Sequence, residues 1–100
     1  MIERLPQAER DALAETLSRW RTLPDRDALG QDWRFGSFSA AWGFLCRVAL
    51  LAERHDHHPE MSNVYGRVTL VLTTHDAGGV TARDVALARA IDALGPARPG

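Results

Sequence analysis

All four histidines of this chain lie between positions 55 and 75, as His55, His57, His58 and His75. The unperturbed pKa of an imidazole is about 6.5, so the ring can both donate and accept a proton near neutral pH. A cluster of imidazoles therefore indicates either acid–base catalysis or a metal site. Nothing in the spacing places His55 with the other three, and we interpret it as a polar residue near a helix end.

Carboxylates accompany these histidines. Glu53 lies four residues before His57, about one helical turn, and Asp84 follows later in the chain. Each carboxylate also has a structural interpretation: Glu53 as a solvated residue in the last turn of a helix, and Asp84 as the acid of a capping box that begins at Thr81. Asp56, next to His57, is interpreted as a loop charge that orients an imidazole.

A metal site is the alternative use of the same histidines, since three imidazoles with an open position are a familiar zinc arrangement. The neighbours His57 and His58 would, however, point to opposite sides of an extended chain. Neither a pair of histidines at helical i, i+4 spacing nor a pair of cysteines accompanies them. The zinc interpretation is therefore the weaker one. We expect no metal and, without a Gly-rich phosphate-binding loop, no nucleotide cofactor.

Composition narrows the class of protein further. Twelve basic and 13 acidic residues give a net charge of −1, which provides no general attraction to nucleic acid or to an anionic membrane. The apolar stretches are shorter than the roughly 20 residues that cross a bilayer, and the start of the chain does not resemble a signal peptide. The single Cys46 cannot form an internal disulfide and is expected to be a buried thiol. We expect a cytoplasmic protein.

The elements that position the histidines follow from the spacing of apolar residues. Helices are predicted over residues 6–20, over 39–54 with Ser37 or Ser39 as its cap, and from Thr81 to near Gly95. Strands are predicted as a short hairpin that pairs 26–29 with 31–36, and as a pair over 60–65 and 67–74. We therefore predict one domain over residues 1–100, of which 95–100 form a frayed tail.

This order, helix, two strands, helix, two strands, helix, predicts a two-layer α+β fold. Its four-stranded antiparallel sheet carries the three helices on one face. In the helix over 39–54, Trp42 belongs to the apolar stripe expected to face the sheet. Phe44 and Leu51 add apolar surface outside that stripe, which self-association would bury. Trp20, Trp33 and Trp42 are all expected in the core.

Two segments, residues 53–65 and 74–84, carry a distinctive set of motifs. The first has Glu53 four residues before a His-His-Pro-Glu run, followed by an Asn-Val-Tyr strand. The second has Thr-His-Asp, paired glycines and Asp84 five residues beyond them. Together these motifs closely resemble the signature of the pterin-4a-carbinolamine dehydratases. With the flanking helices, the resemblance covers nearly the whole chain, and the fold of that family matches the predicted element order.

The resemblance implies an enzyme that dehydrates 4a-hydroxytetrahydropterin to quinonoid dihydropterin and water, in tetrahydrobiopterin recycling and without a cofactor. The three histidines of the family fall on His57, His58 and His75. By this resemblance, His57 and His75 transfer protons at the C4a hydroxyl and N5, and His58 orients the substrate. Glu53 would bind the amino-pyrimidine N–H edge of the substrate. Asp84 would complete the substrate site by orienting His75 and fixing its tautomer.

The expected partners follow from the same resemblance. Besides the pterin substrate, we expect a homodimer or homotetramer through helix 39–54, an aromatic amino-acid hydroxylase in the same pathway, and no direct contact with nucleic acid or membrane. The alternative is a non-catalytic binding module, because animal relatives also act as dimerisation cofactors for a homeodomain transcription factor. A purely structural role gives no reason to retain the histidines. Met61 stands where relatives commonly carry Trp, and its thioether still offers apolar contact to a flat ring.

Overall fold

The computed structural model describes residues 2–94 of the chain. Its helices are α1 (Gln7–Thr16), α2 (Phe38–His55), the short 3₁₀ helix η1 (His75–Ala77) and α3 (Ala82–Asp92). Its strands are β1 (Arg21–Thr22), β2 (Leu29–Arg34), β3 (Glu60–Val64) and β4 (Arg67–Leu72). The predicted α+β order is confirmed. The predicted tail over 95–100 lies outside the described residues.

The strands form one open antiparallel sheet in the order β1-β2-β4-β3. Side chains alternate between its two faces along each strand. On β4, Val68, Leu70 and Leu72 are fully buried, whereas Arg67 is exposed to solvent. Alternation of this kind is typical of a sheet that is covered on one face only.

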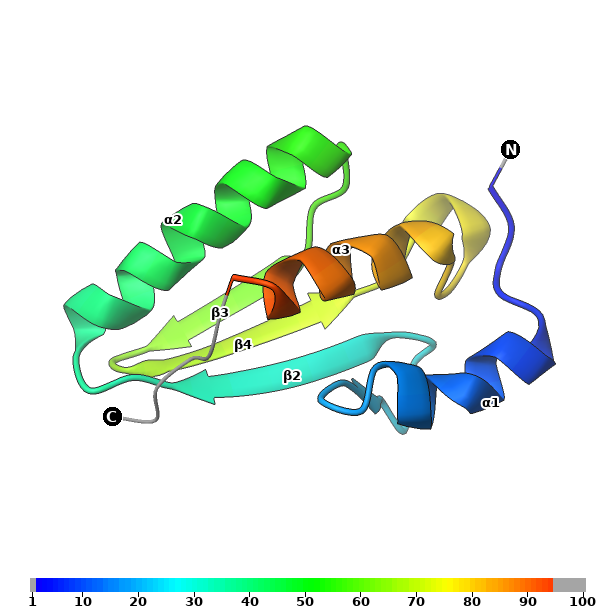
Figure 1. Ribbon diagram of the computed structural model, residues 1–100, viewed down its shortest axis with the longest axis horizontal. Helices are drawn as coiled ribbons and strands as arrows, with labels where there is room; N and C mark the ends of the chain where they lie inside the picture. The colour runs from blue at the N-terminus through cyan, green and yellow to red at the C-terminus, as the bar shows by residue number, and fades with distance from the viewer. Residues whose placement is uncertain (1, 95–100) are drawn as a thin grey trace.

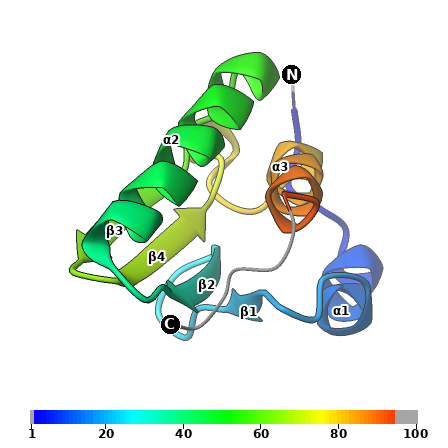
Figure 2. The ribbon, with the colours of Figure 1, turned by 60° about the vertical axis from the view of Figure 1, so that its left-hand side comes forward.

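Helices α2 and α3 lie side by side over the buried face, and α1 lies beside the β1 edge, next to α3 (Figures 1 and 2). The core between these layers is continuous and includes Trp33. The Trp33 ring lies 5.7 Å from that of Trp20 and 5.0 Å from that of Phe44, as measured between ring centroids. Apolar side chains from all three helices therefore share one core with the sheet.

The N-caps of α2 and α3 are among those that the sequence indicates. Ser37 begins α2, and its hydroxyl accepts a hydrogen bond from the Ala40 amide at 3.1 Å. Thr81 begins α3 with a complete capping box, in which Asp84 accepts from the Thr81 amide at 2.9 Å. Because a capping box fixes the first turn of a helix, it also fixes where the Asp84 carboxylate lies.

The paired glycines before α3 each have a structural reason. Gly78 ends η1 in the left-handed region, with a φ of 74°, which disfavours residues that carry a Cβ. A Cβ on Gly79 would collide with the carboxylate of Asp27. The close turn from β4 through η1 into α3 therefore depends on both glycines.

The predicted hairpin between residues 26–29 and 31–36 is wrong. Strand β2 instead pairs with β1, so that Arg21 is opposite Gly30 and Thr22 is opposite Leu29. Side-chain contacts hold the intervening residues in a loop, because Arg26 binds Glu60 and Asp27 binds Arg10. These long-range contacts outweigh local strand propensity.

Helix α1 also ends earlier than predicted, at Thr16 and not near residue 20. Leu17 leaves the helix with a φ of −131°, and both Leu17 and Trp20 are buried. The Trp20 indole N–H donates to the Asp92 carboxylate of α3, at 3.1 and 3.2 Å to its two oxygens. Burying both side chains requires this irregular exit from the helix.

The rotation of α2 about its axis differs from the prediction. Phe44 is buried against Trp33 and Phe35, whereas Trp42, expected in the core, is 55% exposed. Cys46, expected to be a buried thiol, is exposed as well. Apolar residues are so frequent along this helix that the spacing fits more than one buried face. The aromatic contacts of Phe44 select the observed face.

Within residues 2–94, no helix combines the length and the apolar composition needed to cross a membrane.

Candidate functional site

The predicted site residues come from four segments that meet at one end of the sheet. The C-terminus of α2, the start of β3, the end of β4 and the start of α3 all lie at this end (Figure 1). His57 and His58 occupy the connection between α2 and β3, and His75 begins η1 directly after β4. His55 remains in the last turn of α2. The fold therefore brings the three histidines expected in the site to the same end of the sheet.

A tight turn at the end of α2 sets the position of His57. Asp56 adopts the left-handed conformation, with a φ of 49° and a ψ of 44°, and its amide bonds to the Ala52 and Glu53 carbonyls. The His57 amide bonds to the Ala52 carbonyl at 3.1 Å. This arrangement satisfies the last carbonyls of the helix and turns the chain back toward α3.

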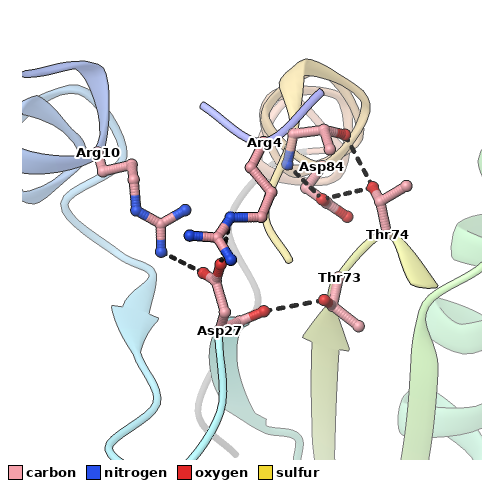
Figure 3. Close-up of polar contacts among 7 residues, drawn as sticks. Arg4, Arg10, Asp27, Thr73, Thr74 and Asp84 are labelled. Atoms are coloured by element: carbon pink, nitrogen blue, oxygen red, sulfur yellow. Dashed lines mark hydrogen bonds and ion pairs between the residues drawn. The ribbon is translucent and has the colours of Figure 1, made fainter. Parts of the chain in front are cut away.

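The buried part of the site is a pair formed by His57 and Asp84. The His57 Nε2 atom lies 2.6 Å from Asp84 Oδ1, and the two side chains are 10% and 0% exposed. The other carboxylate oxygen, Oδ2, accepts from the Thr74 hydroxyl at 2.8 Å and from the Thr81 amide at 2.9 Å (Figure 3). A buried carboxylate is stable in the folded protein when hydrogen-bond donors satisfy it in this way.

The exposed part of the site contains a second imidazole and carboxylate pair. His58 Nε2 lies 3.1 Å from Glu53 Oε1, and these side chains are 63% and 79% exposed. Because both side chains are open to solvent, this contact adds little to stability. Both remain free to exchange their mutual hydrogen bond for contacts with a ligand.

His75 is exposed and lies close to Glu60 at the start of β3. The pKa of Glu60 is lowered, first by its hydrogen bond with Arg26 and to a lesser degree by the nearby His75. The two Arg26 nitrogens lie 2.8 and 2.7 Å from the two Glu60 oxygens, which is a two-point ion pair. The same contact raises the pKa of Arg26. Glu60 therefore connects the loop before β2 to the histidine end of the sheet.

One expected contact is replaced by another. Asp84 was expected to orient His75, but its hydrogen bonds go to His57, Thr74 and Thr81. The reason is geometric, because Asp84 projects inward from the first turn of α3, while His75 lies on the exposed turn that precedes it. Asp84 is fully buried, and its contact with the three histidines is through the His57 imidazole.

The sequence did not indicate the roles of Thr74 and Arg26. Thr74 was visible only as the residue before His75, and a threonine at a strand end carries no signal of its own. Its contact with Asp84 crosses from the start of η1 to α3 and depends on the turn between them. Arg26 lies 34 residues from Glu60 along the chain, so no local spacing connects them.

Within residues 2–94, no group of three or more His, Cys, Asp or Glu side chains has the arrangement of a metal site. The donors at the histidine end instead form separate pairs, His57 with Asp84 and His58 with Glu53. His57 and His58 are thus each hydrogen-bonded to a carboxylate, an arrangement that fixes or supports a proton position.

Comparison with known proteins gives one consistent result. The family described as Pterin 4 alpha carbinolamine dehydratase matches residues 3–94. A protein of Rhodopseudomonas palustris strain BisB18, provisionally named as a pterin-4-alpha-carbinolamine dehydratase, is 52% identical over 94 residues, 94% of this chain and 93% of its own. A Bradyrhizobium protein (strain ORS 278) with the same provisional name is 50% identical over the full length of both chains.

Two solved structures are similar to this fold. The crystal structure of a transcriptional coactivator/pterin dehydratase from Brucella melitensis superimposes with a TM-score of 0.88 at 38% identity, and covers 94% of this chain and 100% of its own. A pterin dehydratase-like protein described as a RuBisCO assembly factor in the alpha-carboxysome gives a TM-score of 0.64 at 26% identity. That match covers 79% of this chain and 92% of the other.

Proposed function

Because this chain belongs to the pterin 4 alpha carbinolamine dehydratase family, we propose that it dehydrates 4a-hydroxytetrahydropterins to quinonoid dihydropterins and water. The observation that supports this proposal most is the buried pair of His57 and Asp84, with His58 and His75 at the same end of the sheet. This end offers imidazoles that can move protons, and carboxylates hold two of them, His57 and His58. The reaction requires no more than that.

The reaction needs one proton donor and one proton acceptor. The C4a–O bond breaks as the leaving oxygen takes a proton and departs as water. The electrons that leave with oxygen are replaced by electrons from the ring nitrogens, and N5 loses its proton. One proton is taken up and one is released, so two general acid–base groups complete the cycle.

His57 is the proposed acceptor of the N5 proton. Its Nε2 faces the Asp84 carboxylate at 2.6 Å, so a neutral His57 carries its proton on Nε2 and presents an unprotonated Nδ1. Accepting a proton at Nδ1 makes an imidazolium, whose positive charge the Asp84 carboxylate stabilises. An aspartate that holds an imidazole in this way is a recurring device of enzymes that use histidine as a base.

His75 is the proposed proton donor to the leaving hydroxyl. It lies at the exposed end of η1, where a bound ring can reach it from solvent. His58 and Glu53 are proposed to orient the substrate. The Glu53 carboxylate can accept two hydrogen bonds from the amino-pyrimidine N–H edge. Met61, half exposed on β3, offers apolar contact to the flat ring.

The test is the rate of 4a-hydroxytetrahydropterin dehydration, followed by ultraviolet absorbance, for the wild type and for His57→Ala with His75→Ala. The wild type is expected to accelerate the reaction, with or without a chelator, and the double variant is expected to lose that acceleration. His55→Ala is the matched control, because His55 lies in the last turn of α2, apart from the carboxylate pairs. No acceleration by the wild type would overturn the proposal, and loss of activity with chelator would favour a zinc site.

The second candidate function is that of a non-catalytic binding module, which the RuBisCO assembly factor of similar fold supports. The strip that would serve it is on α2, where Phe38, Trp42, Cys46 and Leu50 recur every four residues and are all exposed. We propose that this strip instead joins copies of this chain into a dimer or tetramer. Analytical ultracentrifugation of Trp42→Glu should then show smaller assemblies than the wild type.

A further inference from the structure

Thr74 lies between the two histidines that the proposed reaction uses. Its hydroxyl oxygen is 2.8 Å from Asp84 Oδ2 and 2.8 Å from the Thr81 hydroxyl oxygen, and all three residues are buried (Figure 3). His75 follows it directly in the sequence. A single residue thus contacts the carboxylate that holds His57 and begins the turn that carries His75.

Donor counting fixes the direction of the hydrogen bonds around Asp84. An ionised carboxylate can only accept, so the one hydroxyl proton of Thr74 goes to Asp84 Oδ2. The Thr81 hydroxyl must then donate to Thr74, and it accepts from the Arg83 amide at 3.2 Å. The result is a directed chain of donors that starts in the first turn of α3 and ends on the carboxylate.

The same chain determines which nitrogen of His57 is free. Asp84 receives protons at Oδ2 from Thr74 and from the Thr81 amide, so it remains an acceptor at Oδ1. His57 must then donate from Nε2 to Oδ1, and Nδ1 is the nitrogen left for the substrate. Without the Thr74 proton, the carboxylate has one donor fewer on Oδ2 and is free to rotate away from His57.

The backbone of Thr74 holds the turn that carries His75. The Thr74 amide donates to the Gly79 carbonyl at 3.0 Å, and the Gly79 amide donates back to the Thr74 carbonyl at 3.2 Å. The Ala77 amide donates to the same Thr74 carbonyl at 3.1 Å, which closes η1. The side chain of Thr74 therefore contacts the carboxylate that faces His57, and its backbone holds the turn that carries His75.

We propose that Thr74 is a positioning residue, which selects the Nε2–H form of His57 through Asp84 and sets the spacing between His57 and His75. This inference rests on the proposed function for its catalytic meaning, but the state of the His57 ring can be measured without any pterin. The variants are Thr74→Val, which replaces the hydroxyl by a methyl group of similar size, and Thr74→Ser, which keeps the hydroxyl.

Thr73→Val is the matched control. Thr73 is the neighbouring threonine, and its hydroxyl also makes one hydrogen bond, to the Asp27 carbonyl at 2.9 Å. That bond leads away from Asp84. The control therefore reports the cost of removing a threonine hydroxyl at this strand end without touching the chain of donors.

The measurements are ¹⁵N NMR of the imidazole nitrogens and steady-state dehydration kinetics. In the wild type, His57 should be protonated at Nε2 and not at Nδ1, with slow exchange of the Nε2–H proton. Thr74→Val should mix the two tautomers, speed that exchange and lower kcat by about tenfold, with KM changed less than kcat. Thr74→Ser and Thr73→Val should both resemble the wild type.

The NMR and kinetic measurements distinguish a wrong positioning role for Thr74 from a wrong proposed function. If the wild-type His57 ring carries its proton on Nδ1, or if folded Thr74→Val keeps a pure Nε2–H form, the positioning role is wrong. The wild-type spectrum decides the first point even if Thr74→Val does not fold. If the spectra behave as expected but the wild type dehydrates no pterin, the proposed function fails while the assignment of the Thr74 contact stands.

Discussion

Two aspartates at this end of the molecule, Asp84 and Asp27, differ in the partners that surround them (Figure 3). Asp84 is fully buried and faces the imidazole of His57, a type of side chain that can both donate and accept a proton. Asp27 is 19% exposed and faces the guanidinium groups of Arg10 and Arg4, the latter 3.6 Å away. Arginine does not lose its proton in proteins. The same side chain therefore contacts an imidazole in one place, where we propose a role in proton transfer, and guanidinium groups in the other, where it joins segments of the chain.

The contacts of Asp27 join segments that are far apart in the sequence. Its carboxylate joins Arg10 of α1 and Arg4 of the N-terminal segment to the loop before β2. The Asp27 backbone carbonyl accepts a hydrogen bond from the Thr73 hydroxyl. The Asp27 carboxylate lies directly against Gly79, in the turn before α3. Four segments thus meet at Asp27: the N-terminal segment, α1, the end of β4 and the turn before α3. This cluster holds the frame in which Asp84 and His57 are placed.

Asp84→Asn should have the largest effect on activity. An amide in place of the carboxylate presents a neutral group to His57 Nε2, which removes the stabilisation of an imidazolium and favours the wrong tautomer. We expect kcat to fall by about 10²-fold or more. Dehydration kinetics with Asp27→Asn as the matched control should show that the same substitution at the second aspartate leaves kcat per folded molecule unchanged. Equal losses of kcat in the two variants would remove the distinction between them.

Asp27→Ala should have the largest effect on stability. It leaves the partly buried Arg10 and the exposed Arg4 without their shared carboxylate, and we expect the free energy of unfolding to fall by about 2–4 kcal/mol. Asp25→Ala is the control, because Asp25 is an exposed aspartate in the same loop. Urea unfolding followed by circular dichroism measures both. A loss within about 0.5 kcal/mol of the control would show that the cluster is not a structural attachment.

Gly79→Ala tests the same cluster without a change of charge. The added Cβ would collide with the Asp27 carboxylate, so either the turn before α3 or the cluster must shift. We expect a loss of about 1–3 kcal/mol in the free energy of unfolding. Gly43→Ala is the control, since a Cβ there meets nothing within 4 Å, and in a helix it should be neutral or stabilising. Thermal unfolding of both variants shows whether the close approach matters.

Glu60→Gln should have the smallest effect of the four. The ion pair with Arg26 lowers the pKa of Glu60 in the folded protein, so its contribution to stability is present above pH 4.5, the ordinary value. That contribution is lost as the pH falls through the lowered pKa. Because the pair is exposed, the melting temperature of the variant at pH 7 should be only slightly lower than that of the wild type. The difference between their melting temperatures should shrink as the pH falls below 4.5, and a difference that grew in acid would contradict this sign.

The sequence predicts most of the fold because its signals there are local. Apolar spacing, Ser37 and the Thr81 capping box indicate α2 and α3, and the Val- and Thr-rich segment indicates β3 and β4. Prediction from the sequence fails where tertiary contacts determine strand pairing or the buried face of a helix. Pairing of β2 with the two-residue β1 could not be anticipated, because contacts of Arg26 and Asp27 hold the intervening loop. The buried face of α2 was ambiguous for a helix with so many apolar residues.

The candidate site, like the fold, could be predicted only in part: the sequence indicates its residues but not how they pair. Motif spacing and resemblance are enough to select His57, His58, His75, Glu53 and Asp84 as candidates, and their catalytic roles remain predictions. Which carboxylate serves which imidazole could not be read from the sequence. That choice depends on the turn at Gly78 and Gly79 and on the first turn of α3, which aim Asp84 at His57 and not at His75. Pairings of this kind are set by the fold.

A double-mutant cycle on dehydration kcat tests the central claim most directly, with His57→Gln, Asp84→Asn and the two combined. If Asp84 acts through His57, the combined variant loses little more than His57→Gln alone, because the carboxylate has no further role once the imidazole is gone. Multiplied losses in the combined variant, with all three variants folded, would contradict the claim. They would mean that the two side chains act on the reaction independently.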